Sequence, residues 1–197
     1  MSFKYATVLT GSIATGKSSA SQILSALGLA IIDADSIAHQ VLNEQHDAIA
    51  TLFGDTLVAN EKVDRKALGN IVFVDEAKRK QLEALLHPLI YEKIAQHSSQ
   101  LDTLQKPYLI DIPLFFEGNR YPIKKSLVVH TTEELQLQRL MQRNDYNKEE
   151  ALSRMATQIS IDKKCKMGDY VIDNSGTLAQ LEHECQRVKD EIVKDFR

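Results

Sequence analysis

The chain has 197 residues, of which 43% are hydrophobic and 26% charged, a composition typical of one folded domain. Its formal net charge of −3 excludes the strongly basic surface of a duplex nucleic-acid binder, so nucleic acid is not an expected partner. The two cysteines, Cys165 and Cys185, form no CxxC pair, which excludes a zinc-binding framework and indicates a reducing compartment. The apolar run at residues 6–9 is too short for a signal peptide or a membrane span, so we expect a cytoplasmic protein with no membrane partner.

Short apolar runs separated by helical patterns predict the fold. The first run, residues 5–10, ends at Gly11, and a helical pattern follows over residues 16–27. Further apolar runs lie at residues 30–32, 108–112, 126–131 and 170–173. Such alternation predicts a three-layer α/β fold, with a five-stranded parallel sheet and helices on both faces.

The alternation is interrupted by a long, mostly helical stretch at residues 36–106, which we interpret as an insertion. The core is then expected at residues 1–35, 107–139 and 167–197 of a single domain. Pro88 lies inside the helical pattern and predicts a boundary or kink near His87. At the start of the insertion, Asp35 is the more suitable N-cap for the first helix, because Ser36 opens the helical pattern.

Residues 11–18, with the sequence GSIATGKS, fit the phosphate-loop pattern G-x-x-x-x-G-K-[ST] in full. The pattern follows an apolar strand and precedes a helix, which is the context that this loop requires. Its glycines let successive N–H groups converge on phosphate oxygens, and the helix adds its positive end. Lys17 is expected to reach the β- and γ-phosphates of ATP, and Ser18 to place its hydroxyl on Mg²⁺. The expected nucleotide-binding residues of this segment are Gly11, Ile13, Ala14, Thr15, Gly16, Lys17, Ser18 and Ser19.

The loop predicts a nucleotide site without fixing the reaction. The guanine pattern Asn-Lys-x-Asp is missing, and no Asp-x-x-Gly follows Asp111 after the third strand. These observations favour a kinase over a nucleotide-binding regulatory switch, which stays open as an alternative. Asp111 lies where the magnesium-binding acid of such folds is expected. Arg139 and Arg143, one helical turn apart, are candidates to contact ATP phosphates.

The motifs together resemble one family, the dephospho-CoA kinases, along nearly the whole chain. Besides the loop, the resemblance rests on the order and spacing of these segments: Asp33-Ala34-Asp35, Val63-Asp64-Arg65, His87-Pro88, Pro113 to Glu117, Gln138-Arg139-Leu140 with Arg143, Arg154 with Gln158, and Asp169 to Asn174. The chain departs from the family's glycine-rich loop at Ser12 and Ala14, and Ala14 is unfavourable if that position needs a positive φ.

The resemblance implies transfer of the γ-phosphate of ATP to the ribose 3′-hydroxyl of dephospho-CoA, giving CoA and ADP. It implies Asp33 as the group that accepts or orients the hydroxyl proton, with Lys17 and Arg143 as the other catalytic residues. Arg65 and His87 become candidate contacts to dephospho-CoA, and residues 140–166 become a lid in which Lys164 is a weaker candidate. A phosphate-loop kinase of another small acceptor, such as a nucleoside monophosphate, stays an alternative. We expect a monomer or a small homo-oligomer.

Overall fold

The computed structural model describes residues 2–118 and 120–197 and divides the chain into two compact units. The first, the sheet unit, comprises Met1–Ile32 and Ser98–Arg197. The second, the helical unit, comprises Asp33–His97. Among the described residues, no helix combines the length and the apolar character needed to cross a membrane.

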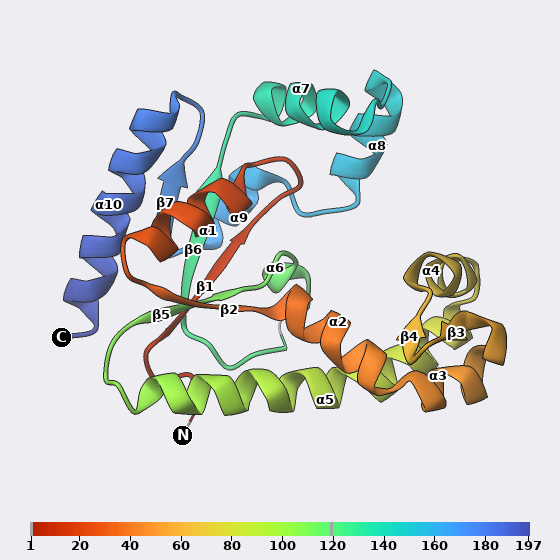
Figure 1. Cartoon of the computed structure of the whole chain (residues 1–197). Helices are drawn as coiled ribbons and strands as arrows, with labels where there is room; N and C mark the ends of the chain where they lie inside the picture. The colour runs from red at the N-terminus through yellow and green to blue at the C-terminus, as the bar shows by residue number, and fades with distance from the viewer. Residues whose placement is uncertain (1, 119) are drawn as a thin grey trace. The chain divides into compact units, whose positions relative to one another are not determined.

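The sheet unit is built on five strands in the spatial order β2-β5-β1-β6-β7 (Figure 1). Their bounds are β1 Ala6–Gly11, β2 Ala30–Asp33, β5 Tyr108–Asp111, β6 Lys125–His130 and β7 Tyr170–Asp173. The central strand β1 pairs in parallel with β5 and β6, and β6 pairs in parallel with β7. All six residues of β1 are buried, as expected for a strand covered on both faces. The predicted α/β fold with a five-stranded parallel sheet is confirmed.

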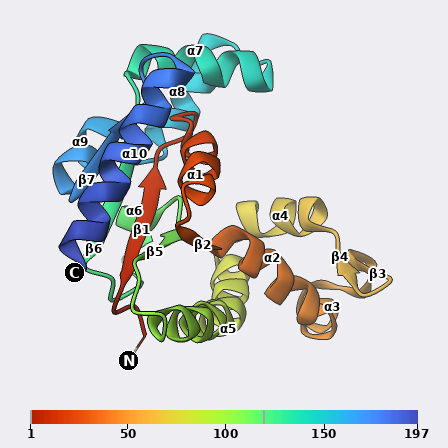
Figure 2. The ribbon, with the colours of Figure 1, turned by 60° about the vertical axis from the view of Figure 1, so that its left-hand side comes forward.

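Helices cover both faces of this sheet because side chains alternate along each strand. On one face, Leu9 and Leu127 join a core that includes buried residues of α1 (Lys17–Ala26) and α10 (Leu178–Asp195). Val128, which points to the other face, lies close to Gly168 at the end of α9 (Ile161–Met167). Figure 2 shows α1 and α10 beside the strands.

The charged segment after β6 forms α7 (Glu133–Asn144), α8 (Lys148–Ala156) and then α9. Asp145, at φ 55°, ends α7, and a capping box between Asn147 and Glu150 begins α8. The short helix α6 (Phe115–Gly118) follows β5.

The helical unit has its own apolar core, formed by Leu42, Ile49, Leu57, Val63 and Leu68. Its elements are α2 (Ala34–Glu44), α3 (His46–Phe53), a 3₁₀ turn (Asp55–Leu57), β3 (Val58–Ala59), β4 (Lys62–Val63), α4 (Arg65–Val74) and most of α5 (Glu76–Asp102). The antiparallel hairpin of β3 and β4 was not predicted, because two-residue strands show no alternation to detect. Its turn residues, Asn60 and Glu61, both have positive φ, which suits a tight hairpin turn.

The structure corrects two expectations for this part of the chain. Of the boundary or kink expected near His87, the boundary is wrong, since α5 is one helix of 27 residues that runs through Pro88. A proline costs an interior helix about 3 kcal/mol, and apolar contacts made before it by Leu82 and Leu86 offset that cost. The N-cap of α2 is Asp33 and not Asp35, because Oδ1 of Asp33 accepts the Ser36 N–H at 3.0 Å.

Candidate active site

The phosphate loop joins the buried end of β1 to the first turn of α1, and two left-handed residues turn it. Ala14 has φ 61° and Gly16, the N-cap of α1, has φ 87°. A Cβ atom at Gly16 would lie 2.0 Å from Nδ2 of Asn174, and one at Gly11 would lie 2.7 Å from Oγ1 of Thr15. Contacts therefore disfavour a side chain at both positions, and at Gly16 the positive φ disfavours one as well. Ala14 occupies the positive-φ position at which the sequence flagged it as unfavourable.

Lys17 and Asp111 are brought together at the carboxyl edge of the sheet. Asp111 ends β5, directly opposite Leu9 of β1, and its carboxylate accepts a hydrogen bond from the Lys17 ammonium. The two side chains are only 18% and 11% exposed. Ser18 and Ser19 lie exposed in the first turn of α1. The arrangement groups one cation, one carboxylate and a helix N-terminus at a single strand edge, which is where ligands bind in open α/β sheets.

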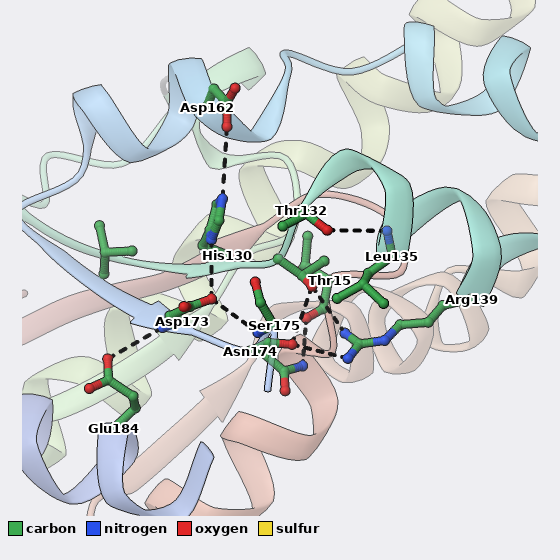
Figure 3. A network of polar contacts seen from close by, with 12 residues as sticks. Thr15, His130, Thr132, Leu135, Arg139, Asp162, Asp173, Asn174, Ser175 and Glu184 are labelled. Atoms are coloured by element: carbon green, nitrogen blue, oxygen red, sulfur yellow. Dashed lines mark hydrogen bonds and ion pairs between the residues drawn. The ribbon is translucent and has the colours of Figure 1, made fainter. Parts of the chain in front are cut away.

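Three side chains hold carbonyl oxygens of the loop. Nζ of Lys164 donates to the Gly11 carbonyl at 2.8 Å, and Nε2 of Gln136 donates to the Ile13 carbonyl at 2.5 Å. Nδ2 of Asn174 donates to the Thr15 carbonyl at 2.8 Å (Figure 3). All three side chains are buried in the sheet unit.

Arg139 and Arg143 occupy different environments. Arg139 donates from Nη2 to the Asn174 carbonyl at 3.0 Å, and a Cβ at Gly16 would lie 3.8 Å from its Nη1 (Figure 3). Arg143 is exposed and donates from Nε to Oδ1 of Asn144 at 2.9 Å. The structure thus brings Arg139 to the loop, and it leaves Arg143 on the exposed side of α7.

The strand edge also carries a second acid, Asp173, at the end of β7. Burial pulls its pKa upward, but hydrogen bonding by Ser175 and the nearby His130 together hold the pKa of Asp173 below its ordinary value. His130 lies between Asp173 and Asp162, as Figure 3 shows. The Ser175 N–H donates to Oδ1 of Asp173 at 3.0 Å, so Asp173 holds the turn that contains Asn174.

The sequence missed a buried ion pair behind the loop. Lys164 is fully buried and its Nζ lies 2.9 Å from Oε1 of Glu117, which also accepts the Ile159 N–H at 3.1 Å. The neighbouring Gln158 accepts the Ile13 N–H at 2.9 Å. A lysine in a charged helical stretch resembles a surface residue, and no local pattern pairs Lys164 with Glu117. Lys164 is placed beneath the loop rather than on an open lid surface.

The three remaining candidates lie in the helical unit. Asp33 is exposed and caps α2 through one carboxylate oxygen. Arg65 begins α4 and donates from Nη1 to Nε2 of His39 at 2.8 Å. His87 is half-buried within α5.

Among the described residues, no three His, Cys, Asp or Glu side chains are grouped as a ready metal site. Mg²⁺ in phosphate-transfer sites is held by one or two protein groups together with substrate phosphates, so a closed cage is not required. Ser18 and Asp111 are oxygen ligands of the type that Mg²⁺ prefers, and they fit it in this respect.

Comparisons with known proteins agree along the whole chain. A family model described as dephospho-CoA kinase matches residues 5–180. Dephospho-CoA kinases from Sulfurimonas denitrificans and Helicobacter pylori are 45% and 43% identical, covering 100% and 95% of this chain and 98% and 97% of their own. A solved dephospho-CoA kinase from Campylobacter jejuni has a TM-score of 0.72 at 37% identity, over 96% of this chain and 98% of that one. The chain belongs to the dephospho-CoA kinase family.

Proposed function

We propose that this protein transfers the γ-phosphate of ATP to the 3′-hydroxyl of the ribose of dephospho-CoA, forming CoA and ADP. The observation that carries the proposal is the loop at residues 11–18, in a chain of this family. The loop leads into the N-terminus of α1, and the Lys17 ammonium lies beside Asp111. The proposed setting is the cytoplasm, with ATP and dephospho-CoA as the substrates.

In the proposed reaction, the loop amides and the start of α1 hold the phosphates. Lys17 leaves Asp111 for the β- and γ-phosphate oxygens, because a triphosphate offers it more negative charge than one carboxylate does. Ser18 and Asp111 would then hold Mg²⁺. When bound, this ion would neutralise negative charge on the phosphates. Arg139, already beside Gly16, stabilises charge on the transferred group, and Arg143 joins it from the next turn of α7.

The acceptor is assigned to the helical unit. Asp33 orients the 3′-hydroxyl and accepts its proton through the oxygen that does not cap α2. Arg65 and His87 bind the body of dephospho-CoA, whose pyrophosphate suits a guanidinium. Residues 140–166 act as a lid, and residues 36–106 bind the acceptor. Closure would exclude the water that otherwise competes with the acceptor for ATP.

An acceptor panel tests the proposal. ADP release is followed with a coupled assay in the presence of dephospho-CoA, a nucleoside monophosphate, a small alcohol or no acceptor. The CoA product is identified by mass spectrometry. We expect stimulation by dephospho-CoA alone, and loss of most turnover in Lys17→Ala. Stimulation of ADP release by the nucleoside monophosphate instead would identify a kinase of another acceptor. No stimulation by any acceptor would favour a nucleotide-binding regulatory switch.

A further inference from the structure

The contacts behind the phosphate loop follow a regular pattern. Carbonyl oxygens of alternate residues, Gly11, Ile13 and Thr15, each accept a hydrogen bond from a buried side chain. The donors come from three separate elements: Lys164 from α9, Gln136 from α7 and Asn174 from the turn after β7. Each donor is more than 120 residues from its acceptor along the chain, with separations of 153, 123 and 159 residues. Local sequence therefore does not create this pattern, and tertiary packing does.

The pattern has a direct consequence for the amides. In a planar trans peptide unit, the C=O of one residue and the N–H of the next point in opposite directions. The described residues contain no cis peptide bond. Holding the carbonyls of Gly11, Ile13 and Thr15 from behind therefore turns the N–H groups of the next residues, Ser12, Ala14 and Gly16, toward the opposite side of the loop.

The intervening amides support this alternation. The Ile13 N–H points to Gln158, which accepts it at 2.9 Å, and the Thr15 N–H is bonded to the Ser12 carbonyl at 3.3 Å. The Ile13 and Thr15 amides are thus consumed inside the protein. The amides of Ser12, Ala14 and Gly16 are the ones turned toward the phosphate side.

We propose that Gln136, Asn174 and Lys164 are positioning residues for phosphate binding. They hold the amides that follow their acceptor carbonyls in an anion-binding orientation before the nucleotide arrives. We call these three residues the brace. A flexible loop would have to turn these peptide units when it binds, at a cost in conformational entropy and affinity. A donor-only ammonium and two amides suit this role, since a carbonyl accepts and never donates. The inference rests on the proposed function insofar as the anion is the phosphate chain of ATP.

Gln136 gives the sharpest test, because its side chain is only 2% exposed and can be replaced by an acid of nearly equal shape. In Gln136→Glu, the ionised carboxylate has no proton to donate and repels the Ile13 carbonyl, whereas the protonated acid regains an O–H donor. Burial raises the pKa of a carboxyl, so protonation is reached in mildly acidic buffer. The brace predicts that this variant recovers nucleotide affinity as the pH falls.

The experiment measures the dissociation constant of a non-hydrolysable ATP analogue with Mg²⁺ at pH 8 and pH 5.5. Wild type, Gln136→Glu, Gln136→Leu and the control Gln138→Glu, an exposed position on the same helix and outside the lid, are compared. Dividing each value by that of the wild type at the same pH removes titration of the nucleotide. The charged groups around the loop are present in all variants, namely Lys17, Asp111, Glu117, Arg139 and Lys164. Thermal melts in parallel show whether each variant is folded.

At pH 8 we expect both Gln136 variants to bind the analogue about tenfold more weakly, the loss of one hydrogen bond to a buried group. At pH 5.5, Gln136→Glu recovers to within about threefold of wild type, while Gln136→Leu does not, since it carries no proton donor at any pH. Should Gln136→Glu fail to fold, Asn174→Asp gives the same comparison at the Thr15 carbonyl.

A pH-independent ratio for folded Gln136→Glu, or wild-type affinity in Gln136→Leu, overturns the brace. Failure of the wild type itself to bind the analogue overturns the proposed function and the inference together. The two failures are distinguished by the wild-type titration alone.

Discussion

Replacing Lys164 by methionine keeps most of the volume of a buried side chain and removes its charge. In the native protein the Lys164 ammonium has no exposure and donates to the Gly11 carbonyl at 2.8 Å and to Glu117 at 2.9 Å. An unsatisfied buried carbonyl costs about 1–3 kcal/mol. Breaking a fully buried ion pair costs about 3–5 kcal/mol, but the Glu117 side chain is 22% exposed and can regain water. The net loss in the free energy of unfolding is therefore about 2–3 kcal/mol.

For a chain of this length, 1 kcal/mol corresponds to about 2–4 °C in the melting temperature, so Lys164→Met should melt about 4–12 °C below wild type. Calorimetry and urea unfolding measure the loss, and Lys163→Met is the matched control because Lys163 is its exposed neighbour. The control should change the free energy of unfolding by less than about 0.5 kcal/mol. Equal melting temperatures for Lys164→Met and Lys163→Met would refute the burial and pairing on which this reasoning depends.

Three further changes have defined outcomes. Asp33→Asn should retain ATP binding and the melting temperature, since Asn caps a helix as well as Asp does, but it should lose most phosphate transfer. Asp33→Ala should also lose about 1 kcal/mol of stability. Full turnover of the Asn variant in the coupled assay would show that Asp33 takes no part in the chemistry. Ala14→Gly should raise the melting temperature slightly. A φ of 61° costs alanine about 1–2 kcal/mol, and the greater freedom of glycine in the unfolded chain cancels only part of the gain from removing that strain. A lower melting temperature would contradict the strain at Ala14. Burial raises the pKa of Cys165 and of Cys185 to about 11, so only about one thiol in a thousand is ionised at pH 8. A disulfide reagent should therefore label the folded protein slowly at pH 8, faster as the pH rises, and rapidly in denaturant. Fast labelling of the native protein at pH 8 would contradict the burial of these thiols.

The elements that the sequence predicted well are those with strong local patterns. The apolar runs at residues 108–112 and 170–173 became β5 and β7 because a doubly covered strand must be apolar throughout. Asp111 lies at the end of β5, as its place after an apolar run predicted, but its contact with the Lys17 ammonium was not predicted.

What could not be predicted depends on distant packing. Gln136 and Asn174 show no local sign of a buried role, and their contacts span more than 120 residues. The continuity of α5 through Pro88 was missed because local propensity is overridden when both halves of a helix are packed. The N-cap was assigned to Asp35 rather than Asp33 because α2 begins two residues earlier than the apolar pattern suggests.

Phosphorylation of dephospho-CoA by the purified protein tests the central claim most directly. With Mg²⁺ and ATP, the account predicts one ADP released for each CoA formed, with the new phosphate on the ribose 3′-oxygen and little ADP release when dephospho-CoA is omitted. Release of ADP at the same rate with and without dephospho-CoA, or a phosphate found on a different acceptor, would contradict it.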